Sequence, residues 1–197
     1  MTVKTPTWTR CIAVVAALTL RGTGIAATAQ AASADGQYRA DRAAAGPVDL
    51  RNSIAAAAAA GKRFAVVWEQ SGCSYCREME TAYFPNPRIG GWIYRHFAIV
   101  TLDLHGSRAI TDFDGSVHPE SALARKYAVH LTPTIQFFPK DPKDVAGRSG
   151  PDIEVARMPG LLEAKDFLAM FQWVADGHGE DFGTFSRRQA EAGGNSP

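Results

Sequence analysis

The stretch from residue 68 to residue 79 reads W-E-Q-S-G-C-S-Y-C-R-E-M and joins a short apolar run to a charged segment rich in helix-forming residues. Its cysteines, Cys73 and Cys76, therefore fall at a strand-to-helix junction. Unpaired backbone N–H groups and the helix macrodipole stabilise a thiolate at such a position. Cys76 follows one helical turn later and can attack a mixed disulfide formed at Cys73. We therefore predict that Cys73 is the nucleophile and Cys76 the resolving thiol.

Other uses of a C-x-x-C pair fit this sequence less well. A disulfide that closes so short a loop constrains the unfolded chain very little, which argues against a purely structural bridge. A zinc site needs further ligands at short spacing, and the sequence has no second C-x-x-C and no H-x-x-x-H. Covalent haem attachment requires histidine after the second cysteine, where this chain has Arg77. Redox exchange is the favoured interpretation, and a passive bridge is the alternative.

The length of 197 residues suits one domain with extensions. A formal net charge of +1 offers no basic surface for nucleic acid, so we expect no nucleic-acid partner. The third cysteine, Cys11, lies in an N-terminal apolar segment. Removal of that segment would leave only the C-x-x-C pair.

Residues 1–31 have the composition of a signal peptide. A basic start precedes an apolar stretch at 11–20, which at about ten residues is too short to span a bilayer. Small residues then offer cleavage after Ala31 or Ala34. An uncleaved anchor or a mitochondrial presequence fits less well. We expect export to an oxidising compartment, most simply a bacterial periplasm.

The remaining chain alternates helical and strand patterns. Residues 35–46 lack a hydrophobic period and are expected to be mobile. Residues 178–197 are predicted to form a polar tail in which Phe182 and Phe185 could dock on the domain. The β-α-β order predicts parallel pairing with a right-handed crossover. The predicted strands are 64–68, 97–104, 134–138 and 153–157, and the predicted helices are 49–60, 73–83, 88–96, 119–127 and 162–175.

Residues 105–119 are polar and contain the turn signal D-F-D-G, which indicates an insertion or a small hairpin. Asp112, Asp114 and His118 in this segment suggest a metal site at first sight. The sequence supplies no further ligands at the spacing of a calcium loop, so the metal hypothesis is disfavoured.

Three motifs in order resemble the thioredoxin superfamily: C-S-Y-C at a strand-helix junction, L-T-P-T at 131–134 before a strand, and P-G-L-L-E-A-K-D-F-L at 159–168 after the last strand. The nearest resemblance is to exported thioredoxin-like proteins, including the periplasmic SoxW-type thioredoxins of sulfur-oxidation gene clusters. It implies an α/β thioredoxin fold over residues 47–177, with a central mixed sheet of four to five strands flanked by helices.

The same resemblance implies a cis peptide between Thr132 and Pro133, beside the sulfurs, whose backbone pairs with the bound substrate chain. Ser74 and Tyr75, between the cysteines, are predicted to contact substrate as well. The turn at 159–160 is expected to border the same groove.

Two further residues are candidate modulators. Thioredoxins carry a buried acid six positions before the first cysteine, where this chain has Val67. Glu69 lies nearer the cysteines and is either a proton relay or a solvated strand-end charge, of which the second is favoured. His130 is either a local electrostatic modulator or an ordinary loop residue, and the second is again favoured.

The resemblance implies a periplasmic thiol–disulfide oxidoreductase that acts on protein disulfides as a reductant. It further implies electron supply from a membrane thiol transporter of the DsbD or CcdA kind. We expect a monomer without cofactor or metal. The alternative is a non-catalytic binding or chaperone module of thioredoxin fold, in which Cys73 and Cys76 form a passive disulfide.

Overall fold

The computed structural model describes residues 1–2, 46–177 and 179–194. The predicted signal peptide and nearly all of the predicted lead-in at 35–46 lie outside the described residues. Within the described ranges, no helix is both long enough and apolar enough to cross a membrane.

The core of the domain is a four-stranded mixed sheet with the order β3-β2-β6-β7. β2 and β3 pair in parallel, whereas β6 pairs antiparallel with both β2 and β7. This arrangement confirms the central mixed sheet that the sequence predicted. The strand bounds are β2 (Arg63–Glu69), β3 (Phe97–Asp103), β6 (Thr134–Phe137) and β7 (Ala156–Pro159).

Both faces of the sheet are covered, which explains why β2 is apolar from Phe64 to Trp68. Val67 points into one hydrophobic cluster and Trp68 into the other, because successive side chains of a strand alternate between faces. The Val67 face packs against η1 (Met79–Tyr83), α4 (Gly90–His96) and α6 (Ala164–Asp176). The Trp68 face packs against α2 (Leu50–Ala59) and α5 (Glu120–Lys126).

Helix α2 begins and ends as its sequence predicts. The Asp49 carboxylate accepts hydrogen bonds from the backbone N–H groups of Arg51 and Asn52, as expected of an N-cap. Gly61 follows the helix with φ +71°, a left-handed conformation that glycine adopts at little cost.

The polar segment at 105–119 forms a hairpin of two short strands, β4 (Ala109–Thr111) and β5 (Val117–Pro119). β4 also pairs in parallel with β1 (Val48–Asp49), which gives a second sheet of order β1-β4-β5. The expected hairpin is therefore present, within a small separate sheet.

Two predicted elements differ in detail. The predicted helix at 73–83 consists of α3 (Ser74–Glu78) followed by the π-helical turn η1. The predicted strand at 153–157 is shifted, because a 3₁₀ turn, η3 (Pro151–Ile153), comes first. The Val155 N–H then bonds to the Phe137 carbonyl, and β7 continues from there. Proline suits the first position of such a turn because its nitrogen has no proton to donate.

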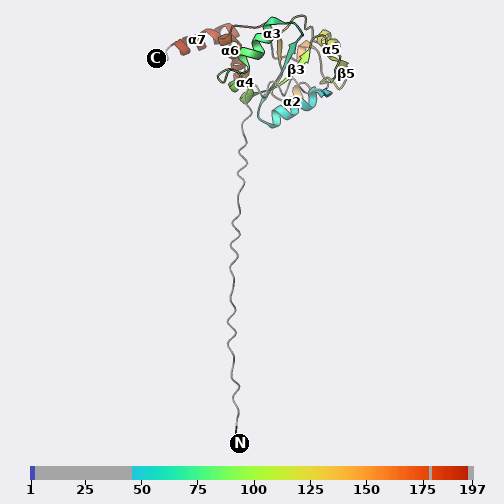
Figure 1. Cartoon of the computed structure of the whole chain (residues 1–197), viewed down its shortest axis with the longest axis vertical. Helices are drawn as coiled ribbons and strands as arrows, with labels where there is room; N and C mark the ends of the chain where they lie inside the picture. Colours follow the sequence, from blue (N-terminus) through green and yellow to red (C-terminus); the bar gives the residue numbers. More distant parts are fainter. Residues whose placement is uncertain (3–45, 178, 195–197) are drawn as a thin grey trace. The chain divides into compact units, whose positions relative to one another are not determined.

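The predicted polar tail contains a helix, α7 (Phe182–Gly194), which contacts α6 (Figure 1). Phe185 is buried, and the Phe182 ring lies 5.8 Å from that of Trp173. The polar tail therefore contains a helix that the sequence did not predict. Phe182 and Phe185 are three residues apart, so they share one helix face, and their docking on the domain is confirmed.

Adjacent glycines at the start of α4 give a test of the packing. A Cβ at Gly90 would lie 1.8 Å from the carbonyl oxygen of Phe84, whereas one at Gly91 would meet only the Arg95 guanidinium, at 3.7 Å. We expect Gly90→Ala to lower the free energy of unfolding by about 1–3 kcal/mol, because the backbone must move. Gly91→Ala is the control and should be neutral or stabilising by up to about 1 kcal/mol. Urea unfolding followed by circular dichroism measures both, and equal effects would contradict the predicted clash.

Candidate redox site

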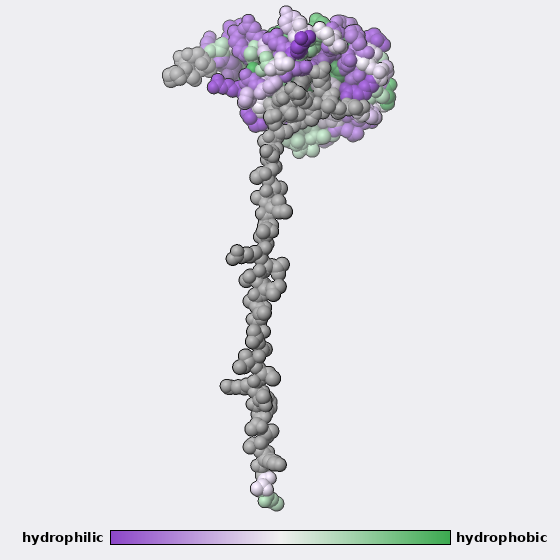
Figure 2. Space-filling model, viewed as in Figure 1, coloured by the Kyte–Doolittle hydropathy of each residue, from purple (hydrophilic) through white to green (hydrophobic). Residues whose placement is uncertain are grey.

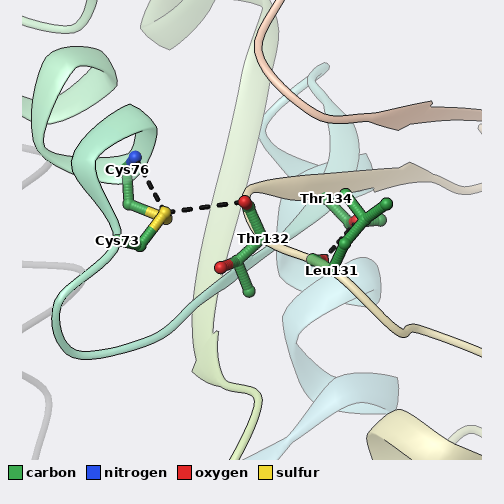
Figure 3. Close-up of a disulfide and its surroundings, with 5 residues drawn as sticks. All are labelled: Cys73, Cys76, Leu131, Thr132 and Thr134. Atoms are coloured by element: carbon green, nitrogen blue, oxygen red, sulfur yellow. Dashed lines mark hydrogen bonds between the residues drawn. A yellow bond between two sulfur atoms is a disulfide. The ribbon is translucent and has the colours of Figure 1, made fainter.

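Cys73 and Cys76 form a disulfide at the start of α3, with 5.2 Å between their Cα atoms. The two sulfurs are not equivalent (Figure 3). Cys73 is half-buried, and its Sγ accepts a hydrogen bond of 3.1 Å from the Cys76 backbone N–H. Cys76 is only 3 % exposed. Cys73 is therefore the sulfur that a second protein can reach first.

A sharp turn between strand and helix presents the pair. β2 ends at Glu69, and the Cys73 N–H bonds back to the Gln70 carbonyl at 3.4 Å. Gly72 has φ +80°, a left-handed conformation that glycine accommodates readily. Cys73 then serves as the N-cap of α3, the strand-to-helix position that the sequence predicts.

The segment before β6 lies against the disulfide. The Thr132–Pro133 peptide bond is cis, and the Thr132 carbonyl oxygen lies 3.5 Å from Cys73 Sγ (Figure 3). Thr134 Oγ1 donates to the Leu131 carbonyl at 2.8 Å, and the Gly160 N–H donates to the Pro133 carbonyl at 2.8 Å. The motifs at 131–134 and 159–168 therefore meet beside the cysteines.

Two large apolar side chains near the disulfide are exposed. Tyr75, between the cysteines, is 60 % exposed, and Leu131, next to Thr132, is 48 % exposed. Hydrophilic residues cover much of the coloured surface on the face that Figure 2 shows. Ser74 is exposed as well. Leu131 was not among the residues predicted to contact substrate, although it belongs to the L-T-P-T motif.

The two candidate modulators differ in their surroundings. Glu69 is 4 % exposed, so its interpretation as a solvated strand-end charge is wrong. As the last residue of β2 it shares the face of Val67, two residues earlier. His130 is exposed on the loop before Leu131, as an ordinary loop residue would be.

The polar residues of the β4–β5 hairpin surround a lysine ammonium. Lys126 Nζ lies 2.8 Å from Asp112 Oδ2, 2.9 Å from Asp114 Oδ2 and 3.5 Å from His118 Nε2. Hydrogen bonds from Ser116 and Lys126 hold the pKa of Asp114 well below its usual value. Across 46–177 and 179–194, no group of His, Cys, Asp and Glu side chains is arranged to hold a metal ion. The hairpin acids are therefore partners of a partly buried cation, Lys126, that the chain itself supplies.

Comparison with known proteins identifies the family of this chain. A sequence profile of the thioredoxin-like domain matches residues 50–175. The chain belongs to the thioredoxin-like domain family. A solved thioredoxin from Thermus thermophilus is 24% identical with a TM-score of 0.50, over 68% of this chain and 89% of that one. A thioredoxin-fold protein from Helicobacter pylori is 20% identical with a TM-score of 0.49, over 67% and 86%. The comparison with curated proteins gave no match.

The thioredoxin-like domain brings the groups for disulfide exchange together where β2 ends and β6 begins. An accessible sulfur, a buried sulfur within bonding distance and the backbone of the Thr132–Pro133 segment lie together. Such a pair can accept or donate two electrons by passing through a mixed disulfide with another molecule. The arrangement supports a redox function for this site.

Proposed function

We propose that the protein is a thiol–disulfide oxidoreductase that exchanges its Cys73–Cys76 pair with disulfides of exported proteins. The asymmetry of the pair carries the proposal, because Cys73 is accessible whereas Cys76 is buried behind it. Client chains would dock on the Thr132–Pro133 segment and on the exposed side chains of Ser74 and Tyr75.

The exchange proceeds in two displacements. The reduced Cys73 thiolate attacks one client sulfur, so that the Cys73–client bond forms and the client disulfide breaks. The departing client sulfur takes a proton from solvent. Cys76 then gives up its proton and attacks Cys73 Sγ, which forms the Cys73–Cys76 disulfide and releases the second client sulfur as a thiol. Two electrons pass from the protein to the client.

The proposed setting is the periplasm, in a role like that of the SoxW-type thioredoxins. A reductant in an oxidising compartment needs a supply of electrons. A membrane thiol transporter of the DsbD or CcdA kind would reduce the Cys73–Cys76 disulfide by the same exchange in reverse. The signal-peptide pattern at 1–31 and the resemblance of the site motifs support this setting, and we propose that the protein acts as a monomer.

The reduction potential of the pair and its activity on insulin test the proposal. We expect the pair to equilibrate with thiol buffers and the wild-type protein to reduce insulin at least about tenfold faster than a Cys73→Ala/Cys76→Ala variant. The double variant has neither cysteine of the pair, so it controls for effects of insulin binding without thiol–disulfide exchange. A pair that stays oxidised in excess strong reductant would instead favour the non-catalytic binding module with a passive disulfide.

A further inference from the structure

A chain of hydrogen bonds between buried polar side chains crosses the sheet. It starts at β2, the strand that precedes the cysteines. The Trp68 indole N–H donates to Gln136 Oε1, and Gln136 Nε2 donates to Glu154 Oε1 at 2.5 Å. Trp68 and Gln136 are each 1 % exposed, and the Glu154 side chain is 6 % exposed. Buried polar groups are costly unless each is paired, so this chain of hydrogen bonds holds its members in defined positions.

Arg157 on β7 ends this chain of hydrogen bonds with four contacts. Its Nη2 and Nε lie 2.5 Å and 2.9 Å from the two carboxylate oxygens of Glu154, a forked ion pair. Its Nη2 also donates to the Tyr127 carbonyl at 2.6 Å, and its Nη1 donates to the Ala128 carbonyl at 2.9 Å. The guanidinium thus binds a carboxylate and the end of helix α5 at the same time.

The carbonyls that Arg157 binds stand at the start of the loop that reaches the disulfide. Tyr127 is the C-cap of α5, and Ala128 follows with φ +50°, an uncommon conformation for a residue with a side chain. Four residues after Ala128, the Thr132 carbonyl lies 3.5 Å from Cys73 Sγ. The 128–133 loop therefore runs from the carbonyls that Arg157 binds to the disulfide.

Arg157 also stands opposite Gln136 in the β6–β7 register. Through Gln136 and Trp68, it is connected to β2, the strand that leads to the cysteines. Arg157, through Glu154 and Gln136, therefore links the strand that leads to the cysteines with the loop that faces the sulfur. Lysine cannot replace it, because an ammonium lacks the planar fork that reaches several acceptors at once.

We propose that Arg157 is a positioning residue of the redox site, which holds the 128–133 loop against Cys73. In the reduced protein the Thr132 carbonyl can accept a hydrogen bond from the Cys73 thiol, and this contact favours the protonated sulfur and covers part of it. Loosening the loop should make Cys73 more reactive toward a small reagent. It should also weaken docking of a client chain, a consequence that rests on the proposed function.

The test compares Arg157→Lys with Arg63→Lys. Arg63 is a matched control because its Nη2 donates to the Ala175 carbonyl in the last turn of α6, and it lies at the opposite end of β2 from the cysteines. We expect Arg157→Lys to raise the rate of Cys73 alkylation by iodoacetamide at pH 6 about threefold or more. The KM for insulin should rise about fivefold or more. Arg63→Lys should change neither.

The two readouts separate the positioning role from the proposed function. If Arg157→Lys is alkylated faster but the wild-type protein does not reduce insulin, the positioning role of Arg157 stands and the proposed oxidoreductase function is wrong. Unchanged alkylation and KM in Arg157→Lys, or equal changes in Arg63→Lys, would overturn the role of Arg157. If Arg157→Lys does not fold, the Glu154→Gln/Arg157→Gln variant, which leaves no unpaired buried charge, takes its place and is judged by the same readouts.

Discussion

Cys76→Ser is expected to leave client proteins covalently attached to the protein through Cys73. The accessible Cys73 sulfur can still attack a client disulfide, but no second thiol remains to release the mixed disulfide. Cys73→Ser should trap at least about tenfold fewer clients, because its remaining sulfur, at 3 % exposure, is buried. Non-reducing electrophoresis after expression with export to a bacterial periplasm would reveal adducts that a reductant removes.

The pair of variants contains its own control for folding. Serine is nearly isosteric with cysteine, and both variants lose the same disulfide, so a difference between them reports the chemistry of the remaining sulfur. Mass spectrometry of the released adducts would identify the clients. Equal and negligible trapping by both variants would count against exchange and for a passive bridge.

Lys126→Met is expected to lower the free energy of unfolding by about 3–5 kcal/mol, because it leaves a buried carboxylate without its countercharge. The Asp112 carboxylate is completely buried, and it would lose the ammonium that lies 2.8 Å away. The Tyr127 hydroxyl, at 2.6 Å, and the Phe113 N–H would remain, but neither carries a charge. Urea unfolding at pH 7 measures the loss.

Lys165→Met is the matched control for that experiment. Lys165 and Glu163 are 3.8 Å apart, and their side chains are 69% and 81% exposed. An exposed pair of this kind contributes about 0–1 kcal/mol, because water already solvates both charges. A loss at Lys126 no larger than that at Lys165 would show that the Asp112 charge does not need its partner.

Features that depend on neighbours in the sequence were predictable. The apolar run ending at Trp68 specified a strand covered on both faces, because no polar side chain is available to face water. The Asp49 cap and the left-handed Gly61 followed from local backbone chemistry. The position of the cysteine pair at a strand-helix junction came from the same short-range reasoning.

Features that depend on which distant segments meet were decided by the tertiary structure alone. Glu69 ends a strand, and only the packing around it determines that its carboxylate is buried. Lys126 becomes the partner of Asp112 because helix α5 lies against the β4–β5 hairpin. Arg157 on β7 donates to the Tyr127 carbonyl at the end of α5, which lies 30 residues earlier in the sequence. Charge pairing has no periodicity along a chain, so the sequence shows these residues but does not show their partners.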